Sequence, residues 1–359
     1  MSIITVNGII KVEELGVVSP HEHVLLCSEK QFVEVEEVSK IYLSKQKVGI
    51  ENIFQLSINP YLVKDNFLLD NPKVAEEELL EFKKAGGDTL VDATSIGIGR
   101  DPVAIRKISR ALDLNIIIGC GYFTAYSQNA EIIEKSVDDI TNEMISDIEI
   151  GICEANIKSD LIVDGAKGNN TGIRAGIIGE IGTSEVIYPF EKKVLIAAAT
   201  VQNKTGLGML VHTHPWAKKG LEALNILEKY GANLSKVVIC HTDVKIDIKY
   251  CKEILKRGAL IEFDDFGKEY IMEGKELMFA TDRERIETML NFIEDGYISN
   301  ILMSVDLCFK CLLHKYGGCG YDHILTNIVP VLIRRGLTMN QINVILKDNP
   351  ARLLDTKFS

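Results

Sequence analysis

The chain has 359 residues, of which 46% are hydrophobic, and its formal net charge at pH 7 is −11. This length and hydrophobic content predict one large domain over residues 1–359, although the length would also accommodate two domains. The negative charge and the dispersed lysines argue against a nucleic-acid groove or an anionic membrane surface as a partner, and no apolar stretch approaches the ~20 residues of a membrane span.

The start of the chain and its cysteines predict a cytoplasmic protein. No basic region followed by an apolar core opens the sequence, so no secretion signal is expected. The eight cysteines form no framework, and Cys120, Cys240 and Cys251 lie in or beside apolar runs, which is typical of reduced core thiols. Cys308 and Cys311 have C-x-x-C spacing, but without a second pair this spacing does not indicate a zinc or redox motif.

The first apolar run of interest ends in two histidines, in residues 17–24 (VVSPHEHV). On a strand, residues two apart point to the same face, so His21 and His23 would project together while Glu22 points the other way. That arrangement presents two nitrogen ligands to one metal ion. Taken alone, the pair is equally well explained as the polar face of a half-buried strand.

Residues 28–70 follow, rich in Val, Glu and Lys and without a clear period. We expect an insertion with short helices, which would form a cap beside a site or a contact between two copies of the chain. A helix is predicted from Pro72 to Phe82, with Asn71 as its N-cap and Gly86-Gly87 as its stop. A short buried strand, residues 88–92, comes next.

From this point apolar runs alternate with helical patterns to the end of the chain. Short apolar runs without alternation are typical of parallel strands that are buried on both faces. Eight such units predict an α/β fold, a (β/α)8 TIM barrel with an insertion after strand 1; a doubly wound sheet is the rival, but no G-x-G-x-x-G follows the first strand. Further strands are expected at residues 115–120, 173–181, 208–211, 237–240, 260–263 and 301–304, and further helices at 102–112, 132–151, 190–203, 218–230, 246–257, 284–295, 323–335 and 339–346.

Polar residues fall at the ends of the predicted strands, where TIM barrels place their active sites. Imidazoles and carboxylates gathered at one rim suit zinc or a similar divalent ion, and their number exceeds what one catalytic zinc takes. Six such groups suit two metal ions bridged by a carboxylate and a hydroxide. The predicted ligands are His21, His23 and Asp306 for the buried metal, His212 and His241 for the exposed one, and Glu180 as the bridge.

Several segments in this order resemble the phosphotriesterase family of the amidohydrolase superfamily. The resemblance covers nearly the whole chain outside residues 28–70 and implies a metal-dependent hydrolase, often a homodimer. It implies two divalent metal ions, zinc first, with manganese or cobalt as alternatives. The segments are residues 16–23 (GVVSPHEH), 98–101 (IGRD), 175–184 (AGIIGEIGTS), 211–213 (VHT), 240–243 (CHTD), 304–306 (SVD), 348–352 (DNPAR) and, more loosely, 263–268 (FDDFGK).

One departure from the family pattern concerns strand 4. The phosphotriesterases proper bridge their metals with a carboxylated lysine, whereas here Gly179 takes the place of the lysine and Glu180 follows it. This is similar to the phosphotriesterase homology proteins, which use a glutamate bridge. The shift by one residue would turn the side chain to the other face of a regular strand, so the backbone must bulge or twist there. The departure does not favour triester hydrolysis as the native activity.

Many relatives of this kind open lactones, so the resemblance implies a lactonase. A metal-bridging hydroxide would attack the carbonyl, and Asp306 would take its proton and pass it to the leaving alkoxide. The same site could instead serve a phosphoesterase, acting on triesters or diesters, or an amidohydrolase. A non-catalytic, metal-stabilised binding protein is the non-enzymatic alternative, disfavoured because no ligand or proton shuttle is missing.

Polar residues near the predicted rim favour a small polar substrate, most simply a phosphorylated sugar lactone, over a long-chain lactone. Lys268 lies after strand 7, in the region where TIM barrels frequently bind phosphate. Arg100 is expected at the same rim. The predicted substrate-binding residues are Tyr122, Lys268, Lys310, His314, Lys315 and Tyr316.

Overall fold

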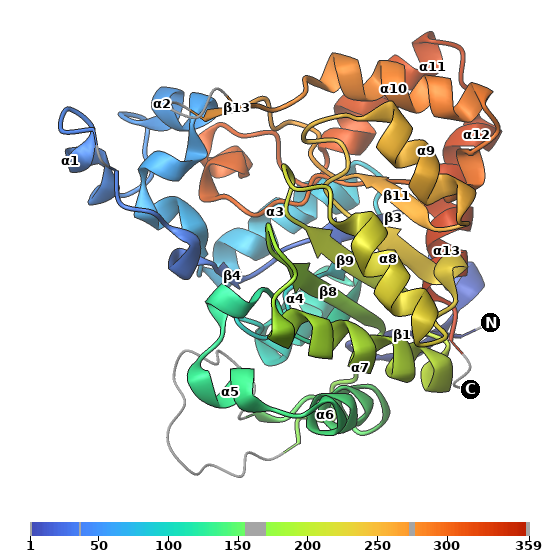
Figure 1. The fold of residues 1–359 in the computed structure, drawn as a ribbon. Helices are drawn as coiled ribbons and strands as arrows, with labels where there is room; N and C mark the ends of the chain where they lie inside the picture. Colours follow the sequence, from blue (N-terminus) through green and yellow to red (C-terminus); the bar gives the residue numbers. More distant parts are fainter. Residues whose placement is uncertain (1, 36, 155–169, 273–276, 357–359) are drawn as a thin grey trace.

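Eight parallel strands form a nearly closed barrel at the centre of the molecule (Figure 1). The computed structural model describes residues 2–35, 37–154, 170–272 and 277–356. Strands that follow each other around the barrel are adjacent and parallel, which confirms the predicted (β/α)8 fold class. In their order around the barrel the strands are β3 (Val18–Glu22), β6 (Thr89–Asp92), β7 (Asn115–Cys120), β8 (Ile177–Thr183), β9 (Met209–Thr213), β10 (Val237–Ile239), β11 (Leu260–Phe263) and β14 (Ile301–Met303).

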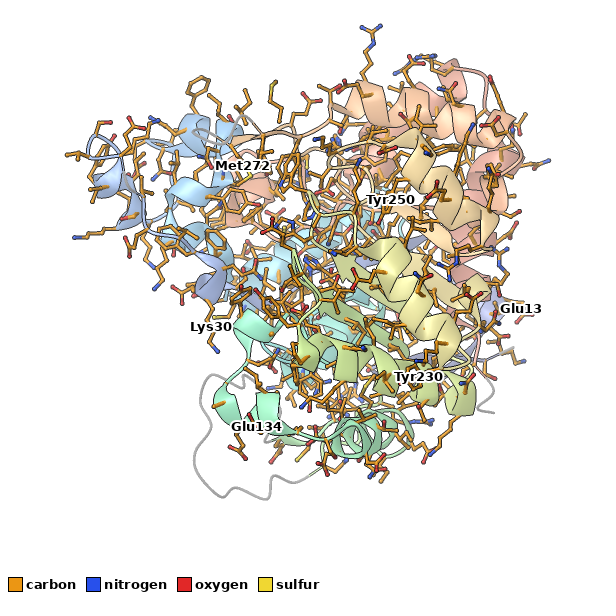
Figure 2. All side chains as sticks on the ribbon, viewed as in Figure 1. Glu13, Lys30, Glu134, Tyr230, Tyr250 and Met272 are labelled. Carbon is orange, nitrogen blue, oxygen red and sulfur yellow. The ribbon has the colours of Figure 1, made fainter. Side chains whose placement is uncertain are left out.

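Helices cover the outer face of the barrel (Figure 1), and α3 packs against α4, α6 against α7, α7 against α8 and α8 against α9. Tyr250 of α9, labelled in Figure 2, accepts a hydrogen bond from the backbone N–H of Gly220 at the start of α8 (2.8 Å). The outer helices are α3 (Pro72–Lys84), α4 (Pro102–Leu112), α5 (Ala130–Glu134), α6 (Val137–Glu149), α7 (Pro189–Thr205), α8 (Gly220–Lys229), α9 (Ile248–Lys256), α10 (Asp282–Glu294), α11 (Val329–Arg334), α12 (Met339–Asn343) and α13 (Asn349–Leu354).

The helix termini follow their sequence signals in most places. The side chain of Asn71 accepts hydrogen bonds from the first turn of α3, as predicted for an N-cap. The single helix predicted over 132–151 is wrong, because the chain forms α5 and α6 there, and Ser136 caps α6 in a reciprocal capping box with Asp139. The two helices predicted near the C-terminus are interrupted, since π-helical turns occupy Ile324–Ile328 and Val344–Asp348.

Three additions extend the barrel: an N-terminal hairpin, the predicted insertion and a small strand pair after β11. An antiparallel hairpin of β1 (Ser2–Thr5) and β2 (Gly8–Lys11) opens the chain, and its Val6 donates a backbone hydrogen bond to Ile116 of β7. The predicted insertion carries the short helices α1 (Ile41–Ser44) and α2 (Ile53–Ile58), which lie at one side of the barrel (Figure 1). It returns through β5 (Leu68–Leu69), which pairs with β4 (Leu26–Cys27), and a second small pair joins β12 (Ile271–Met272) to β13 (Leu277–Met278).

The barrel core explains why the strands read as unbroken apolar runs. One set of side chains fills the interior, while a larger cluster joins the outer face of the strands to the helices. Each barrel strand contributes one fully buried side chain to the interior: Val18, Val91, Ile117, Ile177, Leu210, Val238, Leu260 and Leu302.

None of the eight cysteines, which all lie in the described ranges, forms a disulfide, and this includes Cys308 and Cys311 of the C-x-x-C spacing, in agreement with the reduced state predicted for them. Cys120, Cys240 and Cys251 are buried. Among the helices of the described ranges, none combines the length and apolar character that a membrane crossing requires.

Candidate metal centre

The carboxyl ends of the barrel strands bring the predicted ligand residues together. His21 lies near the end of β3 and His23 just beyond it; the other predicted ligands come from β8, from β9 and from the segments that follow β10 and β14. All of these side chains are buried except that of His212, which is 19% exposed. The six residues that meet are His21, His23, Glu180, His212, His241 and Asp306.

The deeper half of the cluster contains His21, His23 and Asp306. Nε2 of His23 lies 3.2 Å from Oδ1 of Asp306 and 3.8 Å from Oε2 of Glu180. Nε2 of His21 lies 3.6 Å from Oε1 of Glu180 and 3.8 Å from Oδ1 of Asp306. Two imidazoles and two carboxylates therefore converge on one point from three strands.

The more exposed half contains His212 and His241. Nδ1 of His212 lies 2.9 Å, and Nε2 of His241 3.1 Å, from the same Oε1 atom of Glu180. The two imidazole nitrogens are 2.8 Å apart. Glu180 thus stands between both halves, which is the position predicted for a bridging carboxylate.

The strand that carries Glu180 is irregular where the sequence predicted a bulge or twist. The parallel pairing of β8 with β9 shifts register between Ile178 and Ile181. Gly179 has a φ of 113°, and a Cβ atom at this position would lie 2.4 Å from the carbonyl oxygen of Leu210. No side chain fits at residue 179, so the carboxylate of Glu180 faces the site in its place.

Two of the clustered residues have backbone conformations that side-chain-bearing residues seldom adopt. The φ angles are 58° for His241 and 47° for Asp306, in the left-handed region. The backbone N–H of His241 donates to both carboxylate oxygens of Asp264 at 3.0 Å, and that of Asp306 donates to the carbonyl of His21 at 3.2 Å. Such strain is held in place by surrounding contacts and is common at functional sites.

The cluster passes a direct test of its fit to metal ions. Nε2 of His21 is buried and has no hydrogen-bond partner, although it faces two carboxylates at 3.6 and 3.8 Å. Burying an imidazole nitrogen without a hydrogen-bond partner lowers the stability of the fold unless the nitrogen binds a metal ion instead. Groups with ligand atoms close enough for one ion include His21, His23 and Asp306, and also His21, Glu180 and His241. Imidazole and carboxylate donors of this kind suit zinc and similar divalent ions.

Two carboxylates that sequence reasoning missed support the imidazoles from behind. Nδ1 of His21 lies 3.2 Å from Glu262 and 3.3 Å from Asp264, and Nδ1 of His241 lies 3.2 Å from Asp264. Burial raises the pKa of Glu262 although its contact with His21 opposes the rise; burial also acts to raise the pKa of Asp264, but His241 outweighs it and the pKa falls. The signal in the sequence was a pair of acids, two apart, in and just after the apolar strand β11.

Lys268 contacts the cluster through an ion pair rather than facing solvent. Its Nζ lies 2.6 Å from Oδ2 of Asp306 and 3.0 Å from Oδ1 of Asp265, and the side chain is buried. Burial acts to lower the pKa of Lys268, but the two carboxylates outweigh it and raise the pKa well above its usual range. The lysine therefore holds Oδ2 of Asp306, while Oδ1 faces the histidines.

The structure pairs two other predicted substrate-binding residues, Lys310 and His314, with carboxylates. Lys310 pairs with Asp65 at 3.1 Å and lines, with Tyr316, a cavity of about 320 Å³ between β5, α3 and residues 310–321. Nε2 of His314 lies 3.1 Å from Asp322, and Lys315 is exposed.

Tyr122 and Arg100 also have structural partners. The hydroxyl of Tyr122 contacts Glu143 of α6 and Nζ of Lys135. Arg100 is 2% exposed and pairs with Asp147 at 2.8 Å, so the expectation that it lines the rim is wrong. In the described part of the chain, Lys268 is the member of the predicted substrate-binding set that pairs with the cluster.

The model of the phosphotriesterase family matches residues 1–354. The chain is 35% identical to N-acetyltaurine hydrolase of Dictyostelium discoideum, with 98% of this chain and 96% of that protein covered. It is 34% identical to N-acetyltaurine hydrolase of Danio rerio, with 98% and 97% covered.

Solved structures show the same relationship. A resiniferatoxin-binding protein from Rhodobacter sphaeroides is 32% identical, with a TM-score of 0.89 over 99% of this chain and 95% of that one. The phosphotriesterase homology protein of Escherichia coli, solved with phosphate in its active site, is 26% identical, with a TM-score of 0.73 over 95% and 99%. A lactonase from Listeria monocytogenes, at 24% identity and a TM-score of 0.75 over all of both chains, shares the fold. The chain belongs to the phosphotriesterase family and is a hydrolase.

Proposed function

We propose that this hydrolase cleaves the amide bond of a small N-acylated amine that carries an anionic group, with N-acetyltaurine as the first candidate. The observation that carries the proposal is the match to curated N-acetyltaurine hydrolases at 32–35% identity over 98% of the chain. The cluster of imidazoles and carboxylates supports it, because a hydrolytic centre of this kind can act on an amide carbonyl.

In this proposal His21, His23 and Asp306 would hold one divalent ion, His212 and His241 would hold a second, and the carboxylate of Glu180 would serve both. We propose zinc first, with manganese or cobalt as alternatives. Bound there, divalent ions supply electrostatic polarisation of the acyl carbonyl and lower the pKa of a water molecule.

Asp306 is the residue best placed to move the proton. Burial acts to raise its pKa, but the ammonium of Lys268 and the imidazole of His23 outweigh burial and lower the pKa, so the group is ionised at neutral pH. Oδ1 is the oxygen free of Lys268. It accepts the proton that the attacking water loses and returns it to the leaving nitrogen, which departs as a neutral amine.

A phosphorylated sugar lactone is the second candidate. The observation that favours it is the phosphate in the active site of the Escherichia coli relative. The argument from polar rim residues is weaker than the sequence suggested, because Lys310 and His314 already pair with Asp65 and Asp322. A phosphoester remains a third substrate class that the same cluster could serve.

The test is a substrate panel with the metal-loaded protein. N-acetyltaurine, a phosphorylated aldonolactone, an acyl-homoserine lactone and a phosphotriester are compared by kcat/KM, with taurine or acid release as the signal. We expect N-acetyltaurine to give the highest value. We also expect a chelator to abolish turnover and added zinc or manganese to restore it. Faster turnover of a lactone or of a phosphotriester would overturn the amide proposal, and turnover that survives chelation would overturn the metal assignment.

Three broader expectations belong to the same proposal. We propose that residues 1–359 form one domain in which residues 28–70 flank the site, since Lys310 pairs with Asp65 of this insertion. We propose a cytoplasmic location because free thiols persist in reducing compartments. A homodimer, common among relatives, is proposed as the assembly and is checked by light scattering.

A further inference from the structure

The insertion reaches the rim at the carboxyl end of the barrel through residues 59–67. Asn66, which is fully buried, accepts a hydrogen bond from the backbone N–H of Cys311 (2.8 Å) and donates from Nδ2 to the carbonyl of Pro60 (2.9 Å). Cys311 lies in the segment that follows β14, as does Asp306. One asparagine therefore ties this part of the insertion to the segment that carries a proposed metal ligand.

Tyr61 projects from this part of the insertion toward the same segment. Its backbone N–H donates to Oδ1 of Asn59 (3.1 Å). Its ring centroid lies 5.9 Å from that of Phe67, in the insertion, and 5.5 Å from that of Phe309, in the segment after β14. The rings of Phe67 and Phe309 pack edge to face, which is a favoured arrangement of aromatic pairs. Because these contacts hold both the backbone and the ring, the fold sets the direction of the Tyr61 hydroxyl.

The hydroxyl of Tyr61 lies beside the metal cluster. Electrostatic interactions with Cys308, Lys268 and Asp306 place it there. Burial raises the pKa of this phenol first of all, with Cys308 and Asp306 adding to the rise and Lys268 opposing it, so the hydroxyl keeps its proton at neutral pH. It makes no hydrogen bond to any residue of the described ranges, yet it is not sealed from solvent as the hydroxyl of Tyr270 is. A protonated phenol in this position is free to donate to a bound molecule.

An anionic substrate group needs such a donor, because the lysine at the cluster is already paired. Nζ of Lys268 lies 2.6 Å from Asp306 and 3.0 Å from Asp265, and its side chain is 2% exposed. Lys310, in the segment after β14, pairs with Asp65 at 3.1 Å. Protein carboxylates therefore balance the charges of both lysines, whereas the phenol offers a hydrogen-bond donor that is not already engaged.

We propose that Tyr61 is a substrate-contact residue whose hydroxyl donates a hydrogen bond to the anionic group of the substrate. The insertion then supplies part of the substrate site, and its asparagine contacts fix the position of the phenol. This inference rests on the proposed function, in which the sulfonate of N-acetyltaurine is that anionic group. Hydrogen bonds to charged acceptors are stronger than those between neutral groups, so one donor in a fixed position discriminates between an anionic substrate and a neutral one.

The test compares Tyr61→Phe with the wild type, both metal-loaded, by steady-state kinetics with N-acetyltaurine. The substitution removes the hydroxyl and keeps the ring that packs against Phe67 and Phe309. We expect KM to rise on the order of tenfold and kcat to stay within about twofold, because the contact is made equally in the bound substrate and in the transition state. Tyr42→Phe is the matched control, because Tyr42 belongs to the same insertion and is 58% exposed. Neither constant should change in the control.

A second substrate separates contact with the anion from a structural role. N-acetylethanolamine carries a neutral hydroxyl in place of the sulfonate, so its kcat/KM should change by less than about threefold in Tyr61→Phe. An equal loss with both substrates, a fall in kcat at unchanged KM, or wild-type constants in Tyr61→Phe would each overturn the inference. If the wild type does not turn over N-acetyltaurine, the proposed function fails instead. The same comparison is then made with the phosphorylated aldonolactone, and an unchanged KM there overturns the inference as well.

Discussion

Glu180 places a single carboxylate within reach of four imidazoles. Burial acts to raise the pKa of Glu180, but His212 and His21 outweigh it and lower the pKa well below its usual range. The positions of these imidazoles depend in turn on acids behind them. Glu262 contacts Nδ1 of His21, Sγ of Cys240 and Oγ of Ser304, and it is completely buried. Such contacts fix the ring orientation of a metal-binding histidine.

Glu262→Gln is therefore expected to weaken metal binding without removing a proposed ligand. Loss of the anionic partner of His21 should raise the metal dissociation constant on the order of tenfold to a hundredfold. Competition with a chromogenic chelator measures this constant. Glu253→Gln, on the exposed face of α9, is the control. Equal metal affinity in the two variants would show that Glu262 does not orient His21.

The proposed ligands of the site could be predicted from local sequence patterns, whereas the residues that support them could not. The proposed ligands stand out because each is a polar residue at the end of an apolar run, as with His212 after Val211. Glu262 was missed because it lies inside such a run and shows no motif. The sequence pattern assigns Lys310 and His314 to substrate binding because it does not show that Asp65 and Asp322 pair with them.

At the scale of elements, a few hydrogen bonds and ion pairs hold the insertion at residues 28–70 in place. Lys30, labelled in Figure 2, donates to the carbonyl of Ser127 at 3.0 Å, after the end of β7. Asp65 accepts from Nζ of Lys47 (2.7 Å) and from the backbone N–H of Val48 (3.0 Å), and it pairs with Lys310. The sequence predicted short helices here but not these ties, because they join residues far apart in the chain.

Asp65→Asn should destabilise the protein at neutral pH and less so in acid. Burial acts to raise the pKa of Asp65, but Lys47, the Val48 amide and Lys310 outweigh it, and the pKa falls below its ordinary value of 3.8. Because the pKa of this carboxyl is lower in the folded than in the unfolded protein, its ionised form stabilises the fold at pH values above the unfolded-state pKa. This stabilisation is lost as the pH falls through the folded-state pKa. We expect a loss of about 1–3 kcal/mol at pH 7.

Urea unfolding of the wild type and Asp65→Asn from pH 7 to pH 3.5 measures this difference. The gap between the two proteins should narrow toward the acid end of the range. Asp70→Asn is the control, because the side chain of Asp70 is 63% exposed and lies 3.8 Å from Nζ of Lys310, the lysine that also pairs with Asp65. A gap that stays constant with pH would show that the charge of Asp65 is not what holds the insertion.

At the scale of the whole molecule, the eight-strand pattern was readable from the sequence, but the way the barrel closes was not. The strand order ends at β3 and β14, and Glu22 spans the gap between them. Its buried carboxylate accepts hydrogen bonds from the backbone N–H groups of Val305 (3.0 Å) and Leu307 (2.9 Å). Glu22 also accepts a hydrogen bond from the hydroxyl of Ser19 (2.7 Å), so its carboxylate joins the ends of the first and last strands.

Glu22→Ala is expected to lower the free energy of unfolding by about 2–6 kcal/mol, because two buried N–H groups lose their acceptor. Urea unfolding measures the loss, with Glu13→Ala, an exposed position labelled in Figure 2, as the control. Glu22→Gln keeps one acceptor oxygen and should lose less. The Glu22→Gln variant should nevertheless bind metal less tightly than the wild type, because His21, His23 and Asp306 flank the gap that Glu22 spans. A Glu22→Ala protein as stable as the control would show that other contacts close the barrel.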